Sequence, residues 1–146
     1  MAAQPAAKYD HRNLDAMVEC SSGAKLYCGN IVAATNAQVL AEHDIVLVVN
    51  CQGPSTENKF EGDPRFEYQR LPVAMWKSVL AGKSLQGVLD FFLPTLQRID
   101  RALSAGQSVL IHCLAGAHRA STVTGAYLLY KGIVEEPSKL QSYMER

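Results

Sequence analysis

Residues 109–119 read Val-Leu-Ile-His-Cys-Leu-Ala-Gly-Ala-His-Arg, and this stretch decides both the expected fold and the expected chemistry. Residues 108–112 have three consecutive apolar residues at their centre, Val109, Leu110 and Ile111, and we expect a strand there that is buried on both faces of a parallel sheet. A helical stretch follows from about residue 120 to 131 and ends at Gly132. The connection between the two therefore lies at the carboxyl end of a strand and the amino end of a helix.

Such a connection directs several backbone N–H groups at one point, which suits a bound anion. The small residues Ala115, Gly116 and Ala117 allow the backbone to wrap closely around a phosphate group. Arg119 can hold two phosphate oxygens through its forked guanidinium. The same positive field favours the thiolate form of Cys113, which would make this residue a nucleophile facing the phosphoryl group.

The rest of the chain predicts a single α/β domain. Further strands are expected at 24–28, 44–51 and 66–71, and helical spacing of apolar residues runs from 84 to 103. Pro94 lies inside that run and is expected either to kink one helix or to begin a second. Strands separated by helices predict a mostly parallel sheet of about five strands, flanked by helices on both faces.

Two shorter helices are expected outside this frame. Thr35 and Gln38 have the spacing of a capping box, which predicts a helix from there to about Glu42. Pro137 is expected to open a final helix.

Composition and charge exclude several classes of function. The 146 residues carry 14 Lys+Arg and 14 Asp+Glu, so the chain is a poor candidate for a nucleic-acid or membrane-surface binder. No apolar run is long enough to span a bilayer and no secretory signal is evident, so a cytoplasmic or nuclear location is expected. The four histidines lack metal-ligand spacing, and neither a metal nor another cofactor is expected. The sequence does not indicate an oligomeric state.

The segment His112-Cys113-x-x-Gly116-x-x-Arg119 resembles the signature loop of the cysteine-based protein phosphatases, and the upstream sequence is similar to their dual-specificity branch. The resemblance covers roughly 17–146, which leaves 1–16 as an N-terminal extension. It implies hydrolysis of phosphorylated proteins through a phosphocysteine on Cys113, with Arg119 as the phosphate clamp and His112 as a partner that supports the loop. It also implies a phosphate cradle that consists of Leu114, Ala115, Gly116, Ala117, His118 and Arg119.

One departure from the family concerns the residue after the arginine. Family members usually carry Ser or Thr there, and the hydroxyl supports the thiolate when the phosphocysteine is hydrolysed; here the position is Ala120. Because a helix turns by about 100° per residue, neither Ser121 nor Thr122 can be assumed to take over this role. Slow hydrolysis of the intermediate is therefore expected.

A second departure concerns the general acid. The family's aspartate follows the strand that ends here at Pro72, and the aligned position holds Met75; residues 68–89 contain no Asp or Glu. Asp90, His118 or no acid at all are the alternatives. Without an acid, a tyrosine phenolate, with a pKa of about 10, leaves far more readily than a serine alkoxide. Phosphotyrosine or another aryl phosphate is therefore the favoured substrate, with dual specificity as an alternative.

The remaining cysteines have weaker signals. Cys51 ends the strand expected beside the signature strand, and it forms either a disulfide with Cys113 under oxidation or a plain buried thiol. Cys20 and Cys28 are expected to be ordinary buried residues.

Two rival functions stay open. The first is a phosphate-binding module with degraded catalysis, which the missing acid and hydroxyl favour. Cys113 and Arg119 oppose it, because a module that only binds phosphate needs no nucleophilic thiol. The second is a phosphatase for a non-protein substrate such as a glucan or a phosphoinositide.

Overall fold

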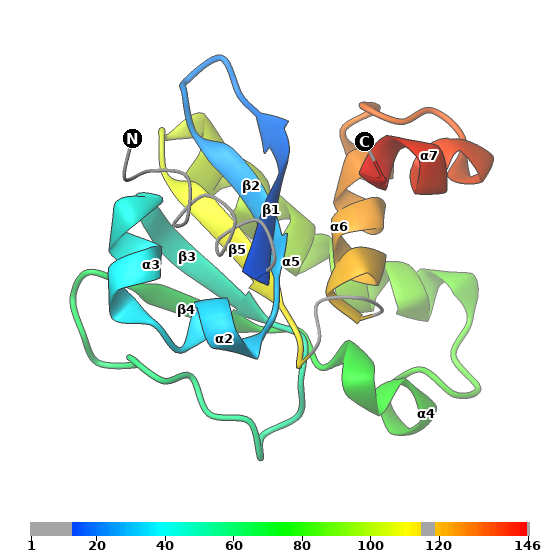
Figure 1. Cartoon of the computed structure of the whole chain (residues 1–146). Helices are drawn as coiled ribbons and strands as arrows, with labels where there is room; N and C mark the ends of the chain where they lie inside the picture. The colour runs from blue at the N-terminus through cyan, green and yellow to red at the C-terminus, as the bar shows by residue number, and fades with distance from the viewer. Residues whose placement is uncertain (1–12, 115–118, 146) are drawn as a thin grey trace.

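The computed structural model of the protein describes residues 13–114 and 119–145, and these residues form a five-stranded sheet with helices around it (Figure 1). The strands lie in the order β1-β2-β5-β3-β4. Neighbouring strands run parallel except β1 and β2, which are antiparallel. This confirms the predicted α/β fold with a mostly parallel sheet. The strands are β1 (Leu14–Glu19), β2 (Lys25–Gly29), β3 (Ile45–Asn50), β4 (Glu67–Arg70) and β5 (Ser108–His112).

Helices cover both faces of this sheet (Figure 1). One face packs against α5 (Leu85–Ser104) and α6 (Arg119–Tyr130), and the other packs against α2 (Ile31–Ala34) and α3 (Ala37–Glu42). In the described part of the chain, no helix combines the length and apolar character that crossing a membrane requires. The shorter elements are the 3-10 helices η1 (Val73–Met75) and η2 (Pro137–Lys139) and the α-helices α4 (Trp76–Val79) and α7 (Leu140–Met144).

β5 is the central strand, and all five of its residues are buried. It pairs with β2 on one side and with β3 on the other, so that His112 stands opposite Gly29 and Asn50. Because the three strands run in the same direction, they end at the same edge of the sheet. The segments that follow them are therefore brought together there.

α5 is one continuous helix of 20 residues, although Pro94 lies inside it. The Ser84 hydroxyl caps its start by accepting a hydrogen bond from a backbone N–H of the first turn. Burying one large apolar side chain contributes roughly 1.5–3 kcal/mol, so three of them outweigh the cost of about 3 kcal/mol for an interior proline. The alternative of two separate helices is therefore wrong. The large buried side chains of this face are Leu96, Ile99 and Leu103.

The predicted capping box is wrong. α3 is capped by Asn36, whose side-chain oxygen accepts hydrogen bonds from the N–H groups of Gln38 and Val39 at 3.1 and 3.2 Å. Thr35 instead ends the preceding helix α2, and its hydroxyl donates to the Ile31 carbonyl at 2.7 Å. The expected helix is therefore present but begins at Ala37, and Asn36, whose side-chain oxygen is one bond farther from the backbone than that of Thr35, takes the capping position.

Residues 14–16, which we expect from the sequence to belong to an N-terminal extension, form the first half of β1. The pairing of β1 with β2 shifts between Ala16 and Val18, which is a bulge. A bulge inserts one residue and sends the side chains after it to the opposite face of the sheet. The alternation that identifies a strand in a sequence is therefore lost here.

Asn36→Ala is expected to lower the free energy of unfolding by about 1 kcal/mol, because the start of α3 loses the acceptor of two backbone N–H groups. Thr35→Ala should cost less, since its exposed hydroxyl contacts only the end of α2. Urea unfolding followed by circular dichroism measures both values. If Thr35→Ala lowers the free energy of unfolding more than Asn36→Ala does, Thr35 is the cap and the capping box is present.

Candidate active site

Two buried cysteines follow neighbouring strands at the carboxyl edge of the sheet. Cys113 follows β5 and is 2% exposed, while Cys51 follows β3 and is fully buried. The Cys51 N–H donates to the His112 carbonyl at 2.9 Å, which extends the pairing of the two strands by one residue. Burial raises the pKa of the Cys51 thiol, and the neighbouring thiols of Cys113 and Cys28 raise it further. Cys51 is therefore a protonated thiol at neutral pH.

His112 lies beneath this edge and is 2% exposed. Its Nδ1 lies 3.4 Å from the Cys113 carbonyl oxygen. Burial lowers the pKa of His112 to about 4, the hydrogen bond to Cys113 opposes this shift, and the charge of Arg70 adds to it. His112 is uncharged at neutral pH and has no imidazolium proton to give. This environment favours a supporting role for His112 over that of an acid.

Arg119 is the first residue of α6, so it and Cys113 stand at opposite ends of the connection from β5 to α6. The Arg119 backbone is therefore at a helix start, where N–H groups have no partner within the helix. Its Nη1 donates to the side-chain oxygen of Gln52 at 3.5 Å. The guanidinium is thus linked to the segment after β3, which carries Cys51.

Only the first residue of the expected phosphate cradle between Cys113 and Arg119 belongs to the described residues. Leu114 is exposed, and its carbonyl accepts a hydrogen bond at 3.0 Å from the N–H of Ile31, at the start of α2. The cradle residues Ala115, Gly116, Ala117 and His118 lie outside the described residues. They include His118, one of the two candidate acids.

Asn50, the last residue of β3, organises the segment 51–58 beside the site. It is fully buried. Its amide donates to the Thr56 carbonyl and to the Asn58 side chain, both at 3.0 Å, and its side-chain oxygen accepts from the Gln52 N–H at 2.9 Å. One buried amide therefore ties together both ends of this segment.

Arg70, the last residue of β4, holds the same segment from the other side. It stands opposite Asn50 in the sheet register. Its guanidinium donates to the carbonyls of Gln52, Gly53 and Thr56. The sequence does not identify Arg70, Asn50 or Gln52 as residues that support the site. The one signal it contains is that Asn50 and Arg70 each lie near the end of an expected strand.

Met75 occupies the position expected for the general acid. It lies in η1 and is 40% exposed. The Ala74 N–H donates to the Cys51 carbonyl at 3.0 Å, which attaches η1 to the site. The Met75 sulfur packs against Gly53 so closely that a Cβ on this glycine would lie 2.8 Å from it. A thioether that cannot donate a proton therefore stands beside the segment that contacts Arg119.

Asp90, the second candidate acid, is exposed on the first half of α5. Its carboxylate accepts a hydrogen bond from Gln86, one turn earlier in the same helix, at 2.8 Å. This pair is an ordinary surface interaction of a helix, and no described contact joins Asp90 to Cys113 or Arg119.

Two side chains of the first turn of α6 lie toward the sheet. Ala120 is fully buried. Burial raises the pKa of Cys28 in β2, and hydrogen bonds with Thr124 and Ser121 lower it in part. The Ser121 hydroxyl thus contacts Cys28, which agrees with the expectation that it does not simply replace the hydroxyl missing at Ala120.

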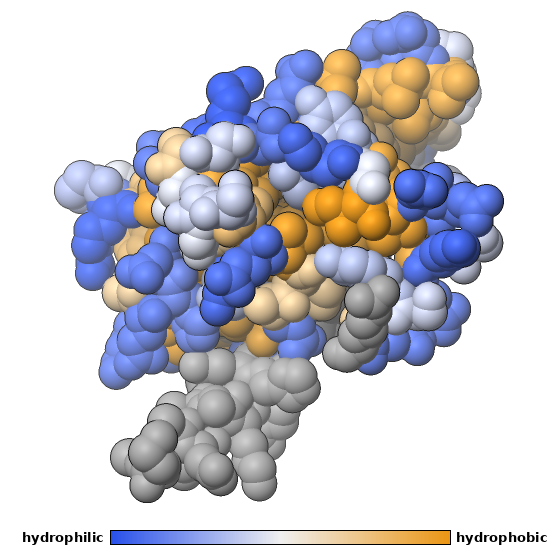
Figure 2. Space-filling model, turned by 90° about the horizontal axis from the view of Figure 1, so that it is seen from above, coloured by the Kyte–Doolittle hydropathy of each residue, from blue (hydrophilic) through white to orange (hydrophobic). Residues whose placement is uncertain are grey.

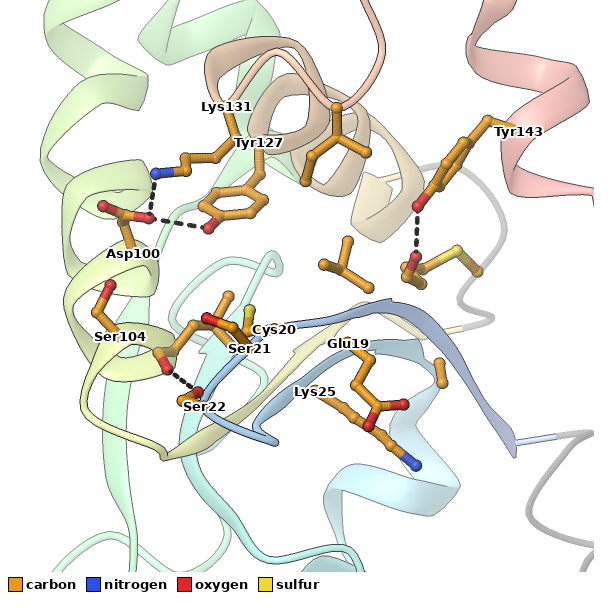
Figure 3. Close-up of a pocket in the computed structure, with 15 residues that line it drawn as sticks. Glu19, Cys20, Ser21, Ser22, Lys25, Asp100, Ser104, Tyr127, Lys131 and Tyr143 are labelled. Carbon is orange, nitrogen blue, oxygen red and sulfur yellow. Dashed lines mark hydrogen bonds and ion pairs between the residues drawn. The ribbon is translucent and has the colours of Figure 1, made fainter.

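A cavity of about 800 Å³ lies at the opposite end of the sheet, around the β1–β2 turn and the ends of α5 and α6 (Figure 3). Cys20 lines it and is only half-buried, so the prediction of a buried residue is wrong for Cys20, whereas it is confirmed for Cys28. Asp100 accepts hydrogen bonds from Tyr127 and Lys131 at 3.1 and 3.0 Å. Figure 2, which views the molecule from above, shows hydrophobic side chains among hydrophilic ones on this face. The cavity is remote from Cys113.

Comparison with known protein families agrees with this geometry. A family model described as the dual specificity phosphatase catalytic domain matches residues 26–141, which include most of β2, all of β3 to β5, and Cys51, Cys113 and Arg119. The chain belongs to this family.

Curated dual specificity phosphatases are similar to most of the chain. Human dual specificity protein phosphatase 6 is 37% identical over 106 residues, which are 73% of this chain and 26% of that protein. Dual specificity protein phosphatase Mpk3 of Drosophila melanogaster is 34% identical over 116 residues, 80% of this chain and 26% of the relative. The chain thus corresponds to about a quarter of the length of these relatives.

Solved phosphatase structures are similar in fold. A variant of human DUSP28 superposes with a TM-score of 0.65 and 25% identity, over 90% of this chain and 79% of that one. The human tyrosine phosphatase-like serine/threonine/tyrosine-interacting protein superposes with a TM-score of 0.63 and 20% identity, over 90% and 82%. Both are consistent with the phosphatase-like α/β fold of the family.

The low pKa of His112 makes stability depend on pH. In the unfolded chain the imidazole takes up its proton near pH 6.5, whereas in the folded protein it does so only near pH 4. The unfolded state therefore binds more protons in this window, and the free energy of unfolding falls as the pH falls. Between pH 7 and pH 5, this single imidazole is expected to lower the free energy of unfolding by about 2 kcal/mol.

His112→Gln should remove this part of the pH dependence. Urea unfolding of both proteins at pH 7 and pH 5 measures it, and the wild-type protein should lose about 2 kcal/mol more than the variant over this interval. Equal losses in the two proteins would mean that His112 titrates normally.

Proposed function

We propose that the protein hydrolyses phosphomonoesters on protein substrates, with Cys113 as the nucleophile and Arg119 as the phosphate clamp. Membership of the dual specificity phosphatase family supports protein phosphatase activity. The observation that carries the proposal is the position of Cys113 and Arg119 at the two ends of one strand-to-helix connection, at the carboxyl edge of parallel strands. Such an edge commonly binds anions, because the backbone N–H groups at a helix start have no partner within the helix and point toward it.

In this proposal the reaction has two steps. The Cys113 thiolate attacks phosphorus, the S–P bond forms, and the P–O bond to the leaving group breaks. Water then attacks the phosphocysteine, releasing inorganic phosphate and regenerating the thiolate. Arg119 and the backbone N–H groups of residues 114–119 stabilise the charge on the phosphoryl oxygens in both steps. His112 supports the loop as a buried, uncharged ring.

The leaving group decides which substrates react. Met75 provides no proton, and Asp90 is engaged with Gln86 on the surface of α5. We therefore assign no general acid among the described residues, and we infer that aryl phosphates such as phosphotyrosine are favoured. Trp76, which follows Met75 and is 54% exposed, offers an aromatic surface to such a ring.

Two further expectations belong to the same site. Ala120 offers no hydroxyl to the departing thiolate, so the second step is expected to be slow. Cys51 and Cys113 follow paired strands, and both are thiols. We therefore still expect a disulfide between them to form under oxidation. A phosphate-binding module without turnover is the second candidate, and the methionine at the acid position favours it.

A stoichiometric burst of aryl alcohol followed by slow turnover is expected when the protein is mixed rapidly with an aryl phosphate. Cys113→Ser should abolish both phases, whereas Cys20→Ser, a change of a thiol at the opposite end of the sheet, should leave both unchanged. Stopped-flow absorbance measures the phases. If neither phase depends on Cys113, the binding module becomes the better proposal.

Met75→Asp is expected to raise turnover of a phosphoserine peptide by at least about tenfold, because it supplies a proton donor where the family carries its acid. The wild-type protein should hydrolyse the matching phosphotyrosine peptide much faster, and its preference should narrow in the variant. Phosphate release from both peptides measures this. Met75→Asn has the same shape as the aspartate and no acidic proton, so an equal gain in that variant would contradict the explanation.

A further inference from the structure

Gln52 connects the segment that follows β3 with Arg119 at the start of α6. Its side-chain oxygen accepts a hydrogen bond from Arg119 Nη1 at 3.5 Å, across 67 residues of sequence. It follows Cys51 directly, and only 8% of its surface is exposed. A polar side chain so far buried normally has a specific partner, and here that partner is the guanidinium of Arg119.

The backbone of Gln52 is held on both sides. Its N–H donates to the Asn50 side chain at 2.9 Å, and its carbonyl accepts from Arg70 Nη1 at 3.1 Å. Both partners end neighbouring strands and stand opposite each other in the sheet. The side chain of Gln52 therefore starts from a point that the sheet itself fixes.

The neighbourhood also restricts where this segment can move. Gly53, the next residue, is covered by the Met75 side chain and bonded to Arg70. Ala74 is tied to the Cys51 carbonyl at 3.0 Å. The backbone that carries the Gln52 side chain is thus held on both sides of residue 52, by Arg70 and by η1.

An amide is well suited to hold an arginine that must bind phosphate. A carboxylate in this place would neutralise the guanidinium and compete with the incoming dianion. The amide oxygen accepts one N–H and leaves the positive charge, together with the remaining N–H donors, available for phosphate oxygens.

We propose that Gln52 is a positioning residue that orients the Arg119 guanidinium for phosphate through its side-chain oxygen. This inference rests on the proposed function, because it assigns a task within the same site. Gln52 itself takes no part in bond making or breaking. Its contribution is to limit the rotamers of Arg119 before phosphate arrives, which reduces the ordering required on binding.

Two substitutions separate positioning from packing. Gln52→Leu removes the acceptor and keeps a buried apolar side chain, and it is expected to lower kcat/KM for an aryl phosphate by about tenfold or more. Gln52→Glu keeps an acceptor oxygen at the same distance, so kcat should stay within about threefold of wild type, while the added charge should raise KM about tenfold.

A packing role predicts the opposite order, because a buried site accepts leucine more readily than a carboxylate. If the leucine variant retains a higher kcat than the glutamate variant, the proposal is wrong. The KM of the glutamate variant should also rise with pH as the introduced carboxylate ionises. Thermal unfolding verifies that each variant folds, and Gln52→Met, which is unbranched like glutamine, replaces the leucine variant if that protein does not.

Calorimetric binding of inorganic phosphate to the wild-type protein, the variants and a Gln141→Leu control keeps this inference distinct from the proposed function. Gln141 lies on α7, is exposed, and donates a side-chain hydrogen bond to Glu145 one turn later, so its variant should match wild type. If wild type binds phosphate without turnover, the proposed catalysis fails, and Gln52→Leu should still weaken binding about tenfold. If wild type turns over substrate and Gln52→Leu changes neither kcat nor phosphate affinity, the inference alone fails. If wild type neither binds phosphate nor turns over substrate, both fail.

Discussion

The pairing of β5 with parallel neighbours on both sides is the constraint on which the site depends. A strand that is hydrogen-bonded on both edges and buried on both faces cannot shift its register without losing its core contacts. Its end is therefore fixed relative to the ends of β2 and β3. Cys113 and Cys51 become neighbours for this reason, although 62 residues of chain separate them. The position of the thiol is thus set by sheet geometry rather than by local loop structure.

The positive charge of this edge of the sheet depends on which acceptors bind the N–H groups of its arginines. The described hydrogen bonds of Arg70 end on backbone carbonyl oxygens, and that of Arg119 ends on an amide oxygen. None of these acceptors carries a full negative charge, so no bonded carboxylate offsets the positive charge of the two guanidinium groups. Two such cations near one strand end, beside an uncharged His112, create an environment that favours an anion.

Sequence reasoning reaches the parts of this molecule that are encoded locally. The apolar run of β5, the helix that follows it and the interval between Cys113 and Arg119 are all visible in a short window. β1 is not, because its bulge interrupts the alternation. The capping prediction places the cap at Thr35 because of its spacing to Gln38, whereas the path of the backbone between α2 and α3 puts the adjacent Asn36 in that position.

The residues that hold the site in place cannot be predicted from local sequence patterns. Asn50 and Arg70 act together because β3 and β4 pair in one particular register, and Gln52 reaches Arg119 because β5 lies on the other side of β3. Such contacts between residues 18 to 67 positions apart have no periodicity that a sequence could display. The family resemblance identifies the nucleophile and the phosphate clamp, but it is silent about the residues that hold them in this chain.

The contact between Met75 and Gly53 couples two positions that lie 22 apart in the sequence. A Cβ at 53 would lie 2.8 Å from the methionine sulfur, so this flexible side chain, which is 40% exposed, would have to move aside. Substitutions at the two positions are therefore expected to be non-additive in stability, because a side chain at 53 fits more easily where the residue at 75 is small.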